Sequence, residues 1–319
     1  MKKKLAKKDW KKILNNYIIT DCAIRESDII YLKAENCTDD DMRQVTLIED
    51  AGDDELGYSS IQFDEAFSSV LGASQKPVSQ GLMVDSIGGF ALPSGGGKTT
   101  WEPELVGGND SALIRKVKMI DGYAWAVGLK RLVSKRYGIN DWRPMVNGIH
   151  FKIDRDREDI FDYGFEDISG FSESEVYAVG GKGDIWWFDG QTWQQCGFPT
   201  NDKLKNVVCA GDGFFYVASG RAIWRGKKNT WEKIDIIELH DELNDLCWFN
   251  NMLWGIGDAD FFIWDGNSIK DFFLCNGEVI HPSGSMDSSN SMMLIASSSA
   301  VWTFDGDEWC NIVPDYNED

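Results

Sequence analysis

The sequence predicts an all-β protein built from repeated four-stranded sheets. A motif of an apolar strand, a turn and a second strand occurs four times in the C-terminal half. Its turns carry glycines 36, 40 and 40 residues apart, at Gly190, Gly226, Gly266 and Gly306. The second strand opens with an aromatic or aliphatic residue at Trp193, Trp231, Ile269 and Trp309. This period is typical of a β-propeller blade, so we predict a single β-propeller of about seven blades, with six or eight as alternatives.

Two more strands precede the turn motif in each of these four repeats. The expected second strands are apolar runs at 175–180, 214–218, 252–256 and 292–296. The expected first strands, nearest the propeller axis, lie at 167–170, 205–209, 244–248 and 283–286. Their small residues suit a crowded position. Tryptophans at 186, 187, 224, 248, 254, 264 and 302 fall on expected strands, and we expect them to pack between blades rather than to bind sugars.

The N-terminal half continues the pattern more weakly. Three further blades are expected from strands at 17–20, 28–32, 44–48 and 58–62, at 81–84, 89–92 and 100–103, and at 116–120, 123–127, 131–134 and 141–145. The propeller therefore spans 17–314, after a basic segment at 1–16 and before an acidic tail at 315–319. The segment 9–13 is similar to the strand at 230–234, which favours an edge strand, but an apolar stripe equally favours a short helix.

Two segments resemble known propeller repeats. Residues 176–181, followed by Trp186 to Gly190 and Trp193, resemble a kelch repeat in their apolar run, glycine pair and tryptophan. Residues 94–101 resemble the Asp-box turn of sialidase-type propellers. Both resemblances imply the same architecture and neither implies an activity.

The charge of the chain is strongly negative and uneven. The net charge is −20, and residues 1–16 carry seven Lys and one Asp, a local +6 that leaves −26 on the rest. Such a surface repels nucleic acid and anionic membranes and attracts cationic partners, although solubility alone also explains it.

The seven cysteines are dispersed, at 22, 37, 196, 209, 247, 275 and 310, without a CxxC pair. They indicate reduced thiols, not disulfides or a zinc site. The basic N-terminus lacks the apolar run of a signal peptide, and no apolar stretch is long enough to span a membrane. We therefore expect a cytoplasmic protein.

No motif predicts catalysis or a cofactor. Residues 97–99 match the end of a phosphate-binding loop, but Leu92 stands where that loop requires glycine. His150, His240 and His281 lie in different blades or linkers, so no triad is expected. Acidic runs offer calcium ligands without the spacing of a calcium loop, and solvated loops explain them more simply. A pair of carboxylates for glycoside hydrolysis stays open among 52 acidic residues.

These traits together favour a protein-binding propeller. They are similar to those of the cytoplasmic immunity proteins of bacterial polymorphic or type VI secretion toxins. The resemblance implies an inhibitor that covers the active surface of a cognate toxin, and the charge favours a basic toxin such as a nuclease. A glycan-directed propeller, either glycoside hydrolase or lectin, and a generic interaction scaffold are the alternatives.

The predicted contact residues are acidic residues in loops. The stretch 146–164 is the longest insertion between blades, which marks it as a candidate for function. The predicted partner-binding residues are Asp39, Asp40, Asp41, Asp53, Asp54, Glu55, Asp154, Asp156, Glu158 and Asp159.

Overall fold

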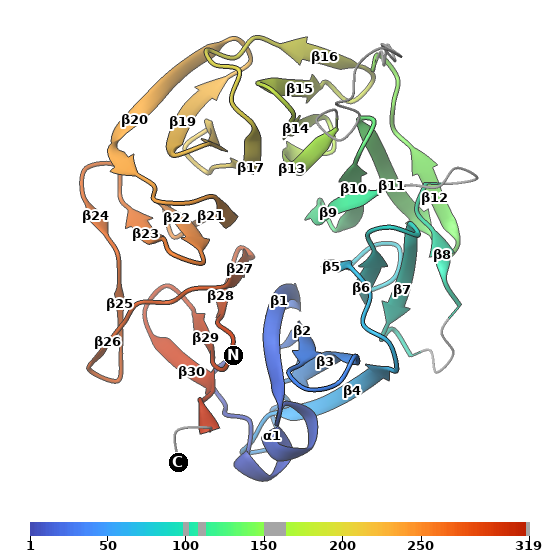
Figure 1. Ribbon diagram of the computed structural model, residues 1–319, viewed down its shortest axis with the longest axis vertical. Coiled ribbons are helices and arrows are strands. Elements are labelled where there is room, and N and C mark those ends of the chain that lie inside the picture. The colour runs from blue at the N-terminus through green and yellow to red at the C-terminus, as the bar shows by residue number, and fades with distance from the viewer. Residues whose placement is uncertain (98–101, 108–112, 150–163, 317–319) are drawn as a thin grey trace. The chain divides into compact units, whose positions relative to one another are not determined.

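The predicted fold class is confirmed. The computed structural model describes residues 1–97, 102–107, 113–149 and 164–316. Within these ranges the strands form seven four-stranded antiparallel sheets, the blades of an all-β propeller, and one two-stranded sheet (Figure 1). The chain divides into two compact units, one of Met1–Phe67 with Asn244–Asp319 and one of Ser68–Leu243.

The first unit holds three blades and the helix. Its elements are α1 (Lys7–Ile13), blade 1 with β1 (Tyr17–Glu26), β2 (Ile29–Asn36), β3 (Met42–Ile48) and β4 (Gly57–Phe63), blade 6 with β21 (Leu243–Phe249), β22 (Met252–Gly257), β23 (Phe261–Trp264) and β24 (Ile269–Lys270), the two-stranded sheet of β25 (Phe273–Cys275) and β26 (Glu278–Ile280), and blade 7 with β27 (Ser285–Ser288), β28 (Met293–Ala296), β29 (Val301–Phe304) and β30 (Trp309–Val313).

The second unit holds the other four blades. They are blade 2 with β5 (Ser69–Ser74), β6 (Gln80–Asp85), β7 (Phe90–Ser94) and β8 (Glu104–Leu105), blade 3 with β9 (Ile114–Ile120), β10 (Tyr123–Gly128), β11 (Leu132–Gly138) and β12 (Asp141–Pro144), blade 4 with β13 (Phe165–Ser172), β14 (Glu175–Gly180), β15 (Asp184–Phe188) and β16 (Trp193–Cys196), and blade 5 with β17 (Leu204–Cys209), β18 (Phe215–Ser219), β19 (Ala222–Lys227) and β20 (Thr230–Glu238).

The second strand of these blades is apolar along nearly its whole length, as expected of a strand that is buried on both faces. All residues of β18 and β28 are buried, and in β14 and β22 only the first residue is partly exposed. The predicted tryptophans follow the same logic. Trp186, Trp254, Trp264 and Trp302 are buried, and Trp187, Trp224 and Trp248 are half-buried, so the expectation of packing holds.

Two sequence predictions about individual elements were wrong. Gly226 lies inside β19, paired with Trp231, and the turn follows it at residues 228–229. A Cβ at Gly226 would meet the Thr230 carbonyl oxygen at 2.2 Å and the Trp231 ring at 2.7 Å, so packing rather than a turn requires glycine there. The first strand of blade 2, β5, was missed because its sequence SVLGAS carries little apolar signal.

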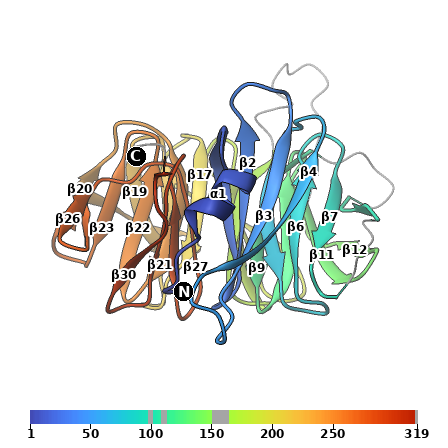
Figure 2. The ribbon, with the colours of Figure 1, turned by 90° about the horizontal axis from the view of Figure 1, so that it is seen from below.

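The basic N-terminal segment is a helix, which decides between the two alternatives. Trp10 and Ile13 of α1 are buried in the core that blade 1 shares with blade 7. Before the helix, the Leu5 N–H donates to the Ile312 carbonyl at 2.8 Å, so the chain touches the last strand of blade 7 without adding a strand to it. Figure 2 shows α1 along the outside of blade 1.

Carboxylates on first strands join neighbouring blades within each unit. Asp287 of blade 7 accepts the Ile24 N–H of blade 1 at 2.8 Å, and Asp245 of blade 6 accepts the Met286 N–H of blade 7 at 3.0 Å. In the second unit, Asp167 of blade 4 accepts the Val207 N–H of blade 5 at 2.9 Å. Each bond links a side chain to the main chain of the next blade.

A buried arginine joins blades 2 and 3. Arg136 is fully buried and donates two bonds of 2.7 Å to the Glu104 carboxylate and one of 2.7 Å to Gln80. Trp142 donates to the same carboxylate at 2.9 Å. Because every partner is buried and paired, this network orders the interior of the unit. Among the described residues, no helix is long and apolar enough to cross a membrane.

Candidate partner-binding surface

The two acidic loops predicted on blade 1 lie at opposite ends of its sheet. Residues 37–41 join β2 to β3, and residues 49–56 join β3 to β4. Because β2, β3 and β4 are antiparallel neighbours, successive loops fall at alternate ends. Figure 2 shows the β2–β3 loop at the top of blade 1. A single flat partner surface therefore cannot contact both loops.

The first of these loops is partly structural. Asp41 is buried and accepts hydrogen bonds from the Tyr17 hydroxyl and, at 2.6 Å, from the Asn36 amide. Burial, and then the hydrogen bond to Asp41, raises the pKa of Tyr17. Asp39 and Asp40 are exposed. Asp41 thus holds the loop in place, and the other two carboxylates face solvent.

The second loop is open to solvent. Asp50, Asp53, Asp54 and Glu55 are exposed, and Glu55 forms an ion pair of 3.1 Å with Lys8. Four of the ten predicted contact residues, Asp154, Asp156, Glu158 and Asp159, lie outside the described residues, as does most of the 146–164 insertion.

An acidic loop that the sequence analysis missed lies at the same end. Residues 305–308 join β29 to β30 in blade 7, and Asp305, Asp307 and Glu308 are exposed. The repeated turn motif that contains them was visible in the sequence, but its acidic residues were assigned to the turn and not to a surface. We call these three residues together with Asp50, Asp53, Asp54 and Glu55 the acidic rim.

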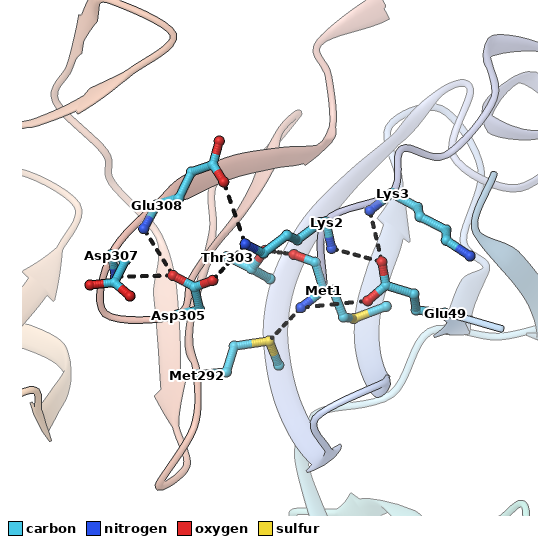
Figure 3. A network of polar contacts seen from close by, with 9 residues as sticks. All are labelled: Met1, Lys2, Lys3, Glu49, Met292, Thr303, Asp305, Asp307 and Glu308. Carbon is cyan, nitrogen blue, oxygen red and sulfur yellow. Dashed lines mark hydrogen bonds and ion pairs between the residues drawn. The ribbon is translucent and has the colours of Figure 1, made fainter. Parts of the chain in front are cut away.

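Residues 1–3 run between the two halves of the acidic rim (Figure 3). Glu49 accepts the N–H groups of Lys2 and Lys3 at 2.8 and 2.9 Å, and Thr303 donates to the Met1 carbonyl at 2.6 Å. The Lys2 ammonium lies 2.9 Å from Asp305 and 3.4 Å from Glu308. The N-terminal segment therefore holds the loop of blade 1 next to the loop of blade 7.

The pKa values at the rim follow from these contacts. The hydrogen bond from Lys2, and then those from the Glu308 and Asp307 N–H groups, hold the pKa of Asp305 well below its usual range. Partial burial raises the pKa of Glu49, but the N–H groups of Lys2 and Lys3 outweigh it and lower the pKa overall. The carboxyl groups of Asp305 and Glu49 are thus ionised at neutral pH, and Lys2, Lys3 and Lys8 offset part of the negative charge around them.

No three His, Cys, Asp or Glu side chains in the described ranges are placed to hold a metal ion. His281 is exposed, with Nδ1 3.0 Å from the Asp271 carbonyl, and His240 lies in the linker between β20 and β21. His150 lies outside the described residues.

Comparisons with solved structures place the fold among propellers. YCF48 bound to D1 peptide is 14% identical, with a TM-score of 0.60 over 95% of this chain and 94% of that one. The WD40 β-propeller domain of Doa1 is 12% identical, with a TM-score of 0.62 over 90% and 92%. At these identities the likeness shows the fold alone. No protein-family model matches the sequence.

A curated relative supplies the family. The fold and this relative, described next, together define a propeller of an immune-protein family. The relative is the immune protein Tsi7 of Pseudomonas aeruginosa, which is 31% identical over 244 residues, covering 74% of this chain and 77% of its own. The chain belongs to the family of Tsi7.

Proposed function

We propose that this chain is a cytoplasmic immunity protein that binds a cognate basic toxin and covers the active surface of that toxin. Membership in the family of an immune protein supports the immunity role. The acidic rim is the main observation that favours a basic partner, because it places seven exposed carboxylates at one end of blades 1 and 7. A solved propeller of the same fold holds a peptide, which fits a protein partner.

A nuclease delivered by a type VI or polymorphic toxin system is the toxin class that fits best. A nuclease groove is basic because it binds phosphates, and an acidic rim offers carboxylates in their place. Complementary charge also speeds association, which suits an inhibitor that must act before damage occurs.

Affinity capture tests this proposal. The tagged chain is incubated with lysate of its native host at low salt, washed, and eluted with high salt, and the eluted proteins are identified by mass spectrometry. We expect one basic protein in the salt eluate, and the purified chain should inhibit its toxic activity. Recovery of an acidic or neutral partner that resists salt, or of carbohydrate alone, would contradict the proposal.

Charge reversal locates the contact surface. The double variant Asp53→Lys/Asp54→Lys changes the acidic rim, and Asp39→Lys/Asp40→Lys makes the same change at the other end of blade 1. We expect the rim variant to lose capture and the matched control to keep it.

A further inference from the structure

A preformed apolar cavity of about 270 Å³ opens between blades 6 and 7. Its floor contains the buried side chains of Trp254, Phe273 and Phe304. Trp309 stacks on Phe273 with ring centroids 3.8 Å apart, and on Phe304 at 4.8 Å. Because the rings hold one another in place, a ligand would meet a shaped surface and would not have to open it.

An inserted hairpin forms one wall of this cavity. β25 and β26 make the only two-stranded sheet in the described part of the chain, beside β24 and β30 at the outer edge of their unit (Figure 1). Leu274, which lines the cavity, is 56% exposed, and Val279 directly opposite it is 54% exposed. Paired residues of an antiparallel ladder point to the same side, so the two side chains form one apolar surface.

The cavity lies at the same end of the blades as the acidic rim. Phe304 and Trp309 flank the 305–308 loop, which belongs to the rim. Asp265 and Ser268, from the corresponding loop of blade 6, also line the cavity. An apolar centre beside a charged border is the usual composition of a protein-binding surface.

The chemistry of the lining favours a protein side chain over a free ligand. Pockets for small molecules hold roughly 300–1,000 Å³ and aim several polar groups at the ligand. Here the Asp265 carboxylate already accepts the N–H groups of Asn267 and Ser268 at 2.9 and 2.7 Å and the Ser268 hydroxyl at 2.9 Å. The lining therefore offers contact area with few available polar groups, and a sugar would find too few partners.

We propose that this cavity anchors the toxin by taking one large apolar or aromatic side chain from a partner segment in which Lys or Arg flank that side chain. The lining carries one anion, Asp265, and one cation, Lys270, so the preference for basic flanks comes from the adjacent rim. This inference rests on the proposed function and adds where the partner is held. Burial of Leu274 and Val279 by the partner would remove apolar surface that the free chain leaves in water.

The first experiment measures affinity for the basic protein that capture recovers. Leu274→Ser removes the apolar wall without changing charge, and Ile87→Ser is the matched control, because Ile87 is 66% exposed in the loop joining β6 and β7. We expect Leu274→Ser to weaken the Kd by about tenfold, as for a central interface residue, and the control to leave it unchanged. An equal Kd for both variants would overturn the anchor while leaving the immunity proposal intact.

The second experiment needs no native partner. A synthetic peptide carries photoreactive p-benzoylphenylalanine between two pairs of lysines, and crosslinks to the full chain are mapped by mass spectrometry. We expect crosslinks within 252–274 and 304–309, competition by the same peptide with tryptophan at its centre, and weaker labelling when serines replace the lysines. Crosslinks elsewhere, or none, would reject the anchor. If capture yields no basic protein, the proposed function fails. The peptide crosslinks then test by themselves whether the cavity binds an apolar side chain with basic flanks.

Discussion

The carboxylate of Asp167 shows how one residue fixes the position of the next blade. It is 2% exposed and accepts the N–H groups of Ile168 at 2.8 Å and Val207 at 2.9 Å. Burial raises the pKa of Asp167, and nearby lysines and these two N–H groups act in the opposite direction. Its two carboxylate oxygens each accept one main-chain N–H, even though burial disfavours the charged form of the side chain.

Removing this carboxylate should destabilise the protein. In Asp167→Ala, two buried N–H groups lose their acceptor, at about 1–3 kcal/mol each, so we expect the free energy of unfolding to fall by about 2–6 kcal/mol. Urea unfolding measures it. Asp307→Ala, at an exposed rim position, should leave the unfolding free energy unchanged. A loss no larger than that of the control would show that water replaces the missing oxygens.

A second residue-scale prediction concerns pH. The N–H groups of Ser268 and Asn267 lower the pKa of Asp265 from 3.8 to about 2. A pKa lowered by folding adds stability that is present above 3.8 and is lost as pH falls towards 2.

The unfolding free energy of wild type should therefore exceed that of Asp265→Ala at neutral pH, and the gap should narrow as the pH drops below about 4. Urea unfolding across this pH range provides the measurement. The gap between Asp265→Asn and Asp265→Ala should stay constant, because neither side chain titrates. If the difference in unfolding free energy between wild type and Asp265→Ala widened in acid, the pKa of Asp265 would not be lowered by folding.

Some of these residue roles were visible in the sequence and others were not. Asp167, Asn206, Asp245 and Asp287 each lie within an expected first strand or directly after one, at intervals of 39, 39 and 42 residues. Alignment of the repeats would have shown a position that favours a polar acceptor. The burial of Asp41 could not be predicted, because it depends on Tyr17 from a different strand.

At the scale of elements, the basic helix α1 has a structural role, because it packs into the core that blades 1 and 7 share. Trp10 is 4% exposed and packs against Tyr316 with ring centroids 5.7 Å apart, and Arg43 donates to the Lys12 carbonyl at 2.8 Å. The apolar face of the helix is buried in the core that blades 1 and 7 share. Its lysines lie on the outside of this contact.

Truncation of that apolar face should cost far more than loss of a lysine. We expect Trp10→Ala to lower the unfolding free energy by about 3–5 kcal/mol, which is typical of a large buried aromatic. Thermal unfolding followed by circular dichroism measures it, and Lys11→Ala, at an exposed position of the same helix, is the control. Similar melting temperatures for Trp10→Ala and wild type would mean that the helix detaches without consequence.

Most elements were predictable because each blade repeats one pattern. The strands of blades 3 to 7 lie close to their predicted positions, since alternation and turn residues act locally. The β25–β26 hairpin was missed because it interrupts the repeat only once. The cavity beside it could not be predicted, because its walls come from segments up to 57 residues apart that only the fold brings together.

For the whole molecule, the expected property is steering of its partner by charge. With a net charge of −20, association with a basic toxin should slow by about tenfold or more as ionic strength rises from low to physiological values, and dissociation should change little. Stopped-flow or surface-based kinetics measure both rates. An association rate that does not vary with salt would show that the charge serves solubility alone.

The carboxylates that reach from one first strand to the main chain of the next blade also bear on how such a protein changes over generations. Every residue except proline brings a main-chain N–H to the receiving position, so the blade junctions tolerate substitutions that side-chain pairing would forbid. Loops at the blade ends can then drift freely while the scaffold keeps its register. This arrangement suits an inhibitor whose target changes by mutation, because the contact loops can change while the blades keep their structure. Blades of the same structure but of little sequence similarity are the expected result.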